Sequence, residues 1–297
     1  MLKLCIALLL WQALSLHRTF AQGWNFDPRV SGIQDRMAKS VVRLVVQKDV
    51  GKWTGSGTLF CFYDSRDPSR QVHAVITTRS LVQNARCLDI SLPHIDSAKP
   101  HVGNNKLFSY NSGNLLVINH PDPIVDMCAV IISREAIQIQ NNWATLGYLP
   151  LDVSILADDA FYKNEKQLDP VVMIGYPDGI IDDVNLQPIF RRGVYATKPA
   201  LDYKGRKEFL LDIPNHGGSA GSPIFHFDDR IYSNRTSGCA NITIGSRLVL
   251  VGISFPGVNP SDSSFSVMPV SGPATSIAWV IKATRIKEIS DLFFTKH

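Results

Sequence analysis

Short apolar segments, each bounded by Gly, Pro, Asn or other polar residues, recur along most of this 297-residue sequence. Segments this short, with little helical periodicity between them, are typical of β-strands. Their close spacing predicts an all-β protein, a barrel or a sandwich, whose strands are joined by tight turns. We expect strands at Val41–Gln47, Lys52–Phe62, Val72–Thr77, Leu88–Leu92, Leu115–Asn119, Met127–Ile132, Val171–Gly175, Ile189–Ala196, Glu208–Ile213, Ile224–Phe227 and Leu248–Phe255.

Three other stretches have different patterns. Residues 22–38 are predicted to be a lead-in segment, and the polar stretch Tyr63–Gln71 a hairpin loop. In Thr284–Phe294 the apolar residues recur at helical spacing, which predicts an amphipathic C-terminal helix. We place the boundary between two β halves near residues 140–150.

The first residues have the pattern of a secretory signal peptide. Lys3 precedes an apolar run, Leu4–Leu16, and a small-x-small pattern ends at Ala21, so we expect cleavage after about residue 21 and a secreted protein. The run is shorter than the roughly 20 residues that a membrane span needs. The whole chain has a net charge of +4, and without Lys3 and Arg18 it would have +2. This small excess gives no reason to expect nucleic acid or a membrane as partner.

Cysteines and sequons suggest extracellular modification. Beyond the predicted signal there are four cysteines, which allow up to two disulfides: Cys61, Cys87, Cys128 and Cys239. We expect Cys61 and Cys87 to be a bonded pair, because they lie near the two ends of the first predicted hairpin. The cysteine spacings are not those of a zinc site, and we expect no metal or cofactor. Asn234 and Asn241 begin glycosylation sequons on what we expect to be one loop.

The stretch Asp212–Phe225 concentrates small residues between two predicted strands. A turn this rich in glycine can point several backbone N–H groups at one spot. The stretch resembles the nucleophile loop of chymotrypsin-fold serine proteases, which reads G-x-S-G-[GS]-P before a β-strand. Gly218, Gly221, Ser222 and Pro223 match this pattern without a gap, and Ala220 stands in the place of the nucleophile.

Further segments resemble secreted bacterial-type trypsin-like peptidases, in the family's chain order. The segments Gly55–Leu59 and Ala74–Val82 are similar to those around the family's catalytic histidine, whose place is taken by Ser80. Asp126 begins a segment similar to the one that carries the family's aspartate. Four more segments match the second half of the family: Gly175–Pro177, Arg191–Gly193, Phe209–Asp212 and Val280–Ile286.

The resemblance covers about residues 40–295 and implies the fold. We expect two antiparallel six-stranded β-barrels of the chymotrypsin type followed by the C-terminal helix. The expected division is a signal peptide at 1–21, an N-terminal barrel at 22–145, and a C-terminal barrel with the helix at 146–297.

The resemblance also implies the site, with Ser80, Asp126 and Ala220 converging in a cleft. Such a site has no general base and no nucleophile, and losing one of these already costs on the order of a millionfold in turnover. The backbone amides of Gly218 and Ala220 need no side chain, so they can still bind a carbonyl or carboxylate oxygen.

These residues favour a secreted, catalytically inactive protease homologue that binds a protein or peptide in the cleft between the barrels, bordered by the Ala220 loop and the strand at Leu250–Gly257. The alternative is an active hydrolase that uses Ser219 with an unrecognised base. Gly217–Gly221 also fits the G-x-S-x-G elbow of α/β-hydrolases, and His216 could be imagined as its base. A structural glycoprotein without a cleft ligand is a third possibility. Asp126 could bond backbone amides at a strand start, or it could simply be inherited from an active ancestor. Arg191–Arg192 could be a cationic binding site, a solvated pair or part of structural ion pairs.

Overall fold

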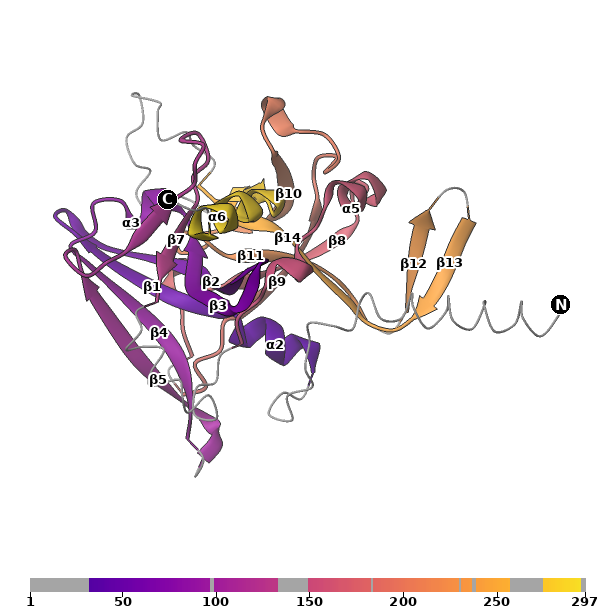
Figure 1. The fold of residues 1–297 in the computed structure, drawn as a ribbon. Coiled ribbons are helices and arrows are strands. Elements are labelled where there is room, and N and C mark those ends of the chain that lie inside the picture. The colour runs from indigo at the N-terminus through magenta and orange to yellow at the C-terminus, as the bar shows by residue number, and fades with distance from the viewer. Residues whose placement is uncertain are drawn as a thin grey trace.

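The computed structural model describes residues 32–96, 99–132, 149–182, 184–229, 231–236, 239–256 and 275–294. The N-terminal part is a seven-stranded antiparallel sheet with the strand order β5-β4-β1-β2-β3-β7-β6 (Figure 1). Its strands are β1 Val41–Lys48, β2 Gly51–Asp64, β3 Asp67–Thr77, β4 Cys87–Asp96, β5 Lys99–Asn111, β6 Val117–Asn119 and β7 Cys128–Ile131.

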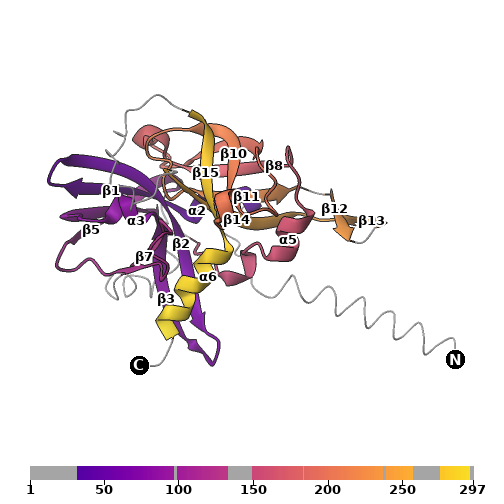
Figure 2. The ribbon, with the colours of Figure 1, turned by 90° about the horizontal axis from the view of Figure 1, so that it is seen from above.

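The C-terminal part is a closed antiparallel barrel in which β9 pairs with β10 to complete the ring β10-β15-β14-β11-β8-β9. Its strands are β8 Pro170–Gly175, β9 Ile189–Tyr195, β10 Glu208–Asn215, β11 Pro223–Asp228, β14 Arg247–Phe255 and β15 Thr275–Lys282. The hairpin of β12 Ile231–Thr236 and β13 Cys239–Ile244 pairs only within itself among the described strands, and it stands apart from the rest in both views (Figures 1 and 2).

The described helices are short, except the last. They are α2 Ile33–Lys39, α3 Arg79–Val82, α5 Asp159–Asn164 and α6 Thr284–Phe294. Figure 2 shows α6 lying along the side of the molecule next to the N-terminal sheet. Ile286 and Ile289 of α6 are fully buried in the core, because the 3.6-residue period puts both on one face.

Three apolar clusters hold the molecule together. One fills the N-terminal sheet with residues such as Leu44, Leu59 and Val75, and another fills the barrel with residues such as Phe209. The third includes Phe60, next in sequence to Leu59, together with side chains of both sheets and of α6. Successive residues of a strand point to opposite faces, so β2 can contribute to two cores at once. Burial on both faces explains why its sequence is a continuous apolar run rather than an alternating one.

Most of the sequence predictions for the fold are confirmed. Each predicted strand range overlaps an observed strand, and the predicted helix at Thr284–Phe294 is α6. The predicted loop Tyr63–Gln71 is wrong in extent, because pairing of β2 with β3 continues to Asp64 and Asp67. The strands β5 and β15, and the helix α2 within the predicted lead-in, were not expected from the sequence. The N-terminal sheet has seven strands rather than six.

The predicted Cys61–Cys87 disulfide is wrong. Cys61, Cys87 and Cys128 are free thiols. Cys61 lies on β2 opposite His73, and its Sγ contacts the side chains of Gln71 and His73. Cys87 begins β4, which pairs with β1 and β5 instead of with that hairpin, and its Sγ bonds to Asp89.

Other modification predictions fall wholly or partly outside the described residues. The predicted signal peptide at 1–21 and the side chains of Cys239, Asn234 and Asn241 are not described. The backbone of Asn234 and Asn241 is described, and it corrects the expected loop. The two residues lie directly opposite each other on β12 and β13.

Candidate functional site

The loop from Asn215 to Ser222 connects β10 to β11 and carries Ala220. Gly218 and Gly221 have φ angles of +79° and +84°, a conformation that side chains rarely adopt. A Cβ on Gly218 would also collide with the carbonyl of Tyr176, and one on Gly221 with the carbonyl of Ser56. Both glycines are therefore required by the close packing of this loop against β2 and the end of β8.

Ser56 of β2 holds the loop in place. Its N–H donates to the carbonyl of Ala220 at 2.8 Å, and its Oγ donates to the carbonyl of Gly218 at 2.9 Å. The same Oγ accepts from the N–H of Tyr176 at 3.0 Å. Ser56 is fully buried, so these bonds are shielded from water. One small side chain thus joins the N-terminal sheet to two segments of the C-terminal barrel.

Three amides of the loop are left without an internal acceptor. The N–H groups of Ser219, Gly221 and Ser222 donate to backbone carbonyls at 2.8–3.1 Å. Those of Gly217, Gly218 and Ala220 have no acceptor among the described residues. Two neighbouring free N–H groups in a glycine-rich turn form a site that favours an anionic or carbonyl oxygen.

Ser80 and Asp126 lie in direct contact. The N–H and Oγ of Ser80 donate to the two carboxylate oxygens of Asp126 at 2.7 and 2.6 Å. Asp126 is 2% exposed, and this burial raises its pKa although the bonds from Ser80 lower it. Lys48 donates from Nζ to the carbonyl of Ser80 at 2.9 Å. Asp126 therefore holds the first turn of α3, as one of the two sequence interpretations expected.

Gly55 lies next to both Ala220 and α3. A Cβ on Gly55 would lie 3.3 Å from the carbonyl oxygen of Ala220 and would collide with Leu81 of α3. The structure thus brings Ser80 and Asp126 into contact. Gly55 lies beside both Ala220 and the helix that carries Ser80. The three positions lie far apart in the sequence, and the packing of the two sheets brings them into one region.

Ser219 is fully buried and already hydrogen-bonded. Its Oγ accepts from Nη2 of Arg191 at 3.0 Å and from the N–H of His216 at 3.3 Å. The imidazole of His216 instead contacts Asp178, with Nδ1 to Oδ2 at 3.0 Å. Burial lowers the pKa of Arg191 to about 10, so the guanidinium remains charged near neutral pH and cannot act as a base.

These contacts resolve two interpretations left open by the sequence. Arg191 is structural, because it also donates to the carbonyl of Pro214 and to Sδ of Met173. The α/β-hydrolase elbow is wrong, because the segment after Ser219 enters the antiparallel strand β11 rather than a helix.

Sequence reasoning missed the supporting roles of Ser56 at the loop and of Lys48 at Ser80. The string Gly55-Ser56-Gly57 contributed to the prediction only as part of a resemblance. Its glycines are a usable signal, because neighbouring glycines in a strand mark a close approach of another segment.

No group of three or more His, Cys, Asp or Glu side chains in the described ranges is placed to hold a metal ion. Of the helices that the structure describes, none is long and apolar enough to cross a membrane.

Four features together define a chymotrypsin-like serine protease fold. They are the antiparallel sheet, the closed six-stranded barrel, the C-terminal helix, and the region where Ser80, Asp126 and Ala220 lie. No family model matches the chain, and no curated protein matches it.

Among solved structures, a substituted form of the HtrA-type protease AlgW with a tripeptide is 14% identical at a TM-score of 0.48, over 87% of this chain and 62% of that one. This chain thus spans less than two thirds of the AlgW chain. A thermostable serine protease, AL20, from an extremophilic microorganism is 13% identical at a TM-score of 0.48, over 88% and 99% of the two chains. The MamO protease domain from Magnetospirillum magneticum is 12% identical at a TM-score of 0.46, over 86% and 97%. At such low scores these likenesses carry no argument about this chain, whose fold assignment depends on its own topology.

Proposed function

We propose that this protein is a secreted, catalytically inactive homologue of trypsin-like serine proteases that binds a protein or peptide partner beside the Ala220 loop. The observation that carries the proposal is the loop itself. Ser56 holds it in place, it presents the free amides of Gly218 and Ala220, and it has a methyl group where a nucleophile is required.

The chemistry of the neighbouring residues supports inactivity. A serine hydroxyl has no basic nitrogen, so Ser80 cannot take a proton from a nucleophile as an imidazole does. Its hydroxyl is already donated to Asp126 at 2.6 Å. The runner-up, a hydrolase using Ser219, is opposed by the burial of that side chain and by the guanidinium at 3.0 Å.

The free amides support binding. Backbone donors fixed by the surrounding fold do not need to reorganise when an oxygen atom enters. Gly218 and Ala220 can therefore hold a carbonyl or carboxylate of a bound chain without any turnover. Part of the predicted cleft border, Leu250–Gly257, is the described strand β14 up to Phe255.

Hydrolysis by designed variants tests the loss of chemistry. The unmodified protein should neither hydrolyse casein nor react with a fluorophosphonate. Ala220→Ser and Ser80→His should each stay inactive, and the double variant should gain measurable activity, because the triad works as a unit. Labelling or hydrolysis by the unmodified protein that disappears in Ser219→Ala would show that the runner-up is correct.

Amide resonances test the binding. Peptides from a tryptic digest of casein are the probe, and the signals of Gly218 and Ala220 should shift on their addition. If both signals stay unchanged while the protein is folded, the peptide-binding part of the proposal is wrong.

A further inference from the structure

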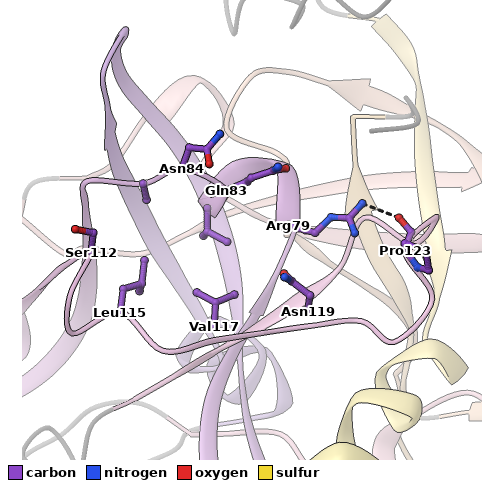
Figure 3. A pocket seen from close by; sticks show the side chains of 10 residues that line it. Arg79, Gln83, Asn84, Ser112, Leu115, Val117, Asn119 and Pro123 are labelled. Carbon is purple, nitrogen blue, oxygen red and sulfur yellow. Dashed lines mark hydrogen bonds between the residues drawn. The ribbon is translucent and has the colours of Figure 1, made fainter. Parts of the chain in front are cut away.

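A cavity of about 600 Å³ lies between α3 and the segment that contains β6 (Figure 3). Its volume is in the range of about 300–1,000 Å³ that ligand clefts occupy. Ser80 of the site described above belongs to α3, but neither Ala220 nor Ser219 lines this cavity. The cavity is therefore a separate candidate for binding, and a ligand could occupy it whether or not the proposed function is correct.

The cavity combines apolar and polar side chains in a way that suits a peptide. Its apolar part comes from Val82 and Ala85 on one side and Leu115 and Val117 on the other. Figure 3 shows the side chains of Leu115, Val117 and Asn119 pointing from one segment toward the α3 side. These three residues alternate along the chain, as expected for one face of an extended strand.

The polar part of the cavity has amides and one positive charge. Gln83, Asn84 and Asn119 have side-chain amides, which both donate and accept hydrogen bonds. Arg79 is the only charged residue of the lining, and no carboxylate lines the cavity. Nη2 of Arg79 donates to the carbonyl of Pro123 at 2.7 Å. A guanidinium has five N–H donors, so most of those on Arg79 are available to a ligand.

The strand β6 has an unpaired edge next to this cavity. It is the last strand of the seven-stranded sheet and pairs with β7 alone among the described strands. The N–H of Ile131 bonds to the carbonyl of Leu116, and the N–H of His120 bonds to the carbonyl of Met127. Bonded and non-bonded pairs alternate in an antiparallel ladder, so Ile118 forms the bonded pair between these two.

The backbone groups of Val117 and Asn119 must then point away from β7. They have no hydrogen-bond partner within the described part of the chain. Two residues with outward N–H and C=O groups form a template for one additional strand. Any strand that pairs there places every second side chain on the face of the sheet where Val117 and Asn119 line the cavity.

We propose that the groove between α3 and β6 binds an extended peptide segment of a partner protein, which pairs with Val117 and Asn119 and places an acidic side chain against Arg79. The unpaired edge of β6 and the guanidinium of Arg79 together favour this ligand, an extended peptide with an acidic side chain. A free anion would use Arg79 but leave the strand edge unpaired, and an uncharged strand would leave the free N–H donors of the guanidinium unused. Backbone pairing gives the affinity, and the contact with Arg79 gives the preference for an acidic residue.

The test uses eight-residue peptides of alternating threonine and valine that carry one glutamate, each with a glutamine counterpart. Addition of a glutamate peptide should slow hydrogen exchange at the amides of Val117 and Asn119, and leave that of Ile118 unchanged. The best glutamate peptide should bind about tenfold more tightly than its glutamine counterpart, because hydrogen bonds to a charged group are the stronger ones. In Arg79→Gln that difference should disappear while the exchange pattern remains.

Proline substitution tests the strand edge. Val117→Pro removes one outward N–H and should abolish peptide binding. Leu107→Pro is the matched control: Leu107 is an exposed residue on β5 at the opposite edge of the same sheet, and its N–H also points outward by the register with β4. This control should leave binding unchanged. If Val117→Pro fails to fold, the peptide is changed instead of the protein. One peptide is methylated on the backbone nitrogens of its odd residues and a second on those of its even residues, and only one of the two should lose binding.

Three outcomes would overturn the proposal. They are the absence of binding by every peptide, binding without protection of Val117 and Asn119, and equal binding of the glutamate and glutamine peptides. The signals of Gly218 and Ala220 report on the other site in the same spectra, so the failure of one proposal is distinguishable from the failure of the other.

Discussion

Ser56 is the residue on which the arrangement of the Ala220 loop depends most directly. It has no reactive role, yet its hydroxyl and its N–H bond to Gly218, Ala220 and Tyr176. Buried polar groups cost free energy when they lose a partner, so a single hydroxyl can fix the position of two loops.

Ser56→Ala should therefore destabilise the protein by about 2 kcal/mol or more, because it leaves the carbonyl of Gly218 and the N–H of Tyr176 buried without a partner. The free energy of unfolding from urea denaturation measures the effect. Ser246→Ala is the matched control, since that hydroxyl bonds to Asp229 at an exposed position, and it should change stability by no more than about 0.5 kcal/mol. Equal effects of the two substitutions would contradict the role assigned to Ser56.

At the scale of elements, buried charges tie α5 to the barrel. His226 of β11 is 5% exposed and lies between Glu165, just after α5, and Asp228. Arg247 of β14 also contacts Asp228, at 2.8 Å. Nδ1 of His226 and Oε2 of Glu165 are 2.9 Å apart, so the two side chains form an ion pair when the histidine is protonated. Burial alone would lower the pKa of His226, but Asp228 and Glu165 outweigh it and raise the pKa to about 9.

This raised pKa predicts how stability depends on pH. A histidine whose folded pKa exceeds its value of 6.5 in the unfolded chain stabilises the protein fully below pH 6.5. The contribution, on the order of 3 kcal/mol, is lost as the pH rises through about 9. Urea denaturation from pH 6 to 10 should show this loss in the unmodified protein, and His226→Gln should have a flatter profile. A His226→Gln profile that still falls across this window would assign the effect to other groups.

At the scale of the whole molecule, apolar packing rather than a disulfide joins the two sheets within the described residues. The cluster that includes Phe60, Phe225 and Ile286 draws on both sheets and on α6. Cys61 and Cys128 are buried, and burial raises the pKa of Cys61 to about 11 and that of Cys128 further. A raised pKa leaves little thiolate, which is the reactive form.

Alkylation with iodoacetamide measures this directly. In the folded protein Cys61 and Cys128 should stay unmodified, and in denaturant without any reductant Cys61, Cys87 and Cys128 should all react. Mass spectrometry of the digested protein locates each adduct. If any of these three thiols needs a reductant before it reacts, the free-thiol state is wrong.

The sequence by itself determined the fold class, because short apolar segments and turn residues are local signals. The strand at Val41 and the helix at Thr284 could be predicted in this way. The resemblance to trypsin-like peptidases also predicted that Ala220 and Ser80 occupy the positions of a nucleophile and a base, because the matching motifs follow the same order. The strand β5 could not be predicted, because its polar sequence is extended only by pairing with β4.

Only the tertiary structure decided which residues meet. The contact of Ser80 with Asp126, the support of the Ala220 loop by Ser56 and the burial of Ser219 against Arg191 all join segments distant in sequence. It also decided that Cys61 and Cys87 are free, because proximity in the chain does not say which strands will be neighbours. Hydrogen bonds and packing between sheets depend on positions in space, and no local pattern of residues carries that information.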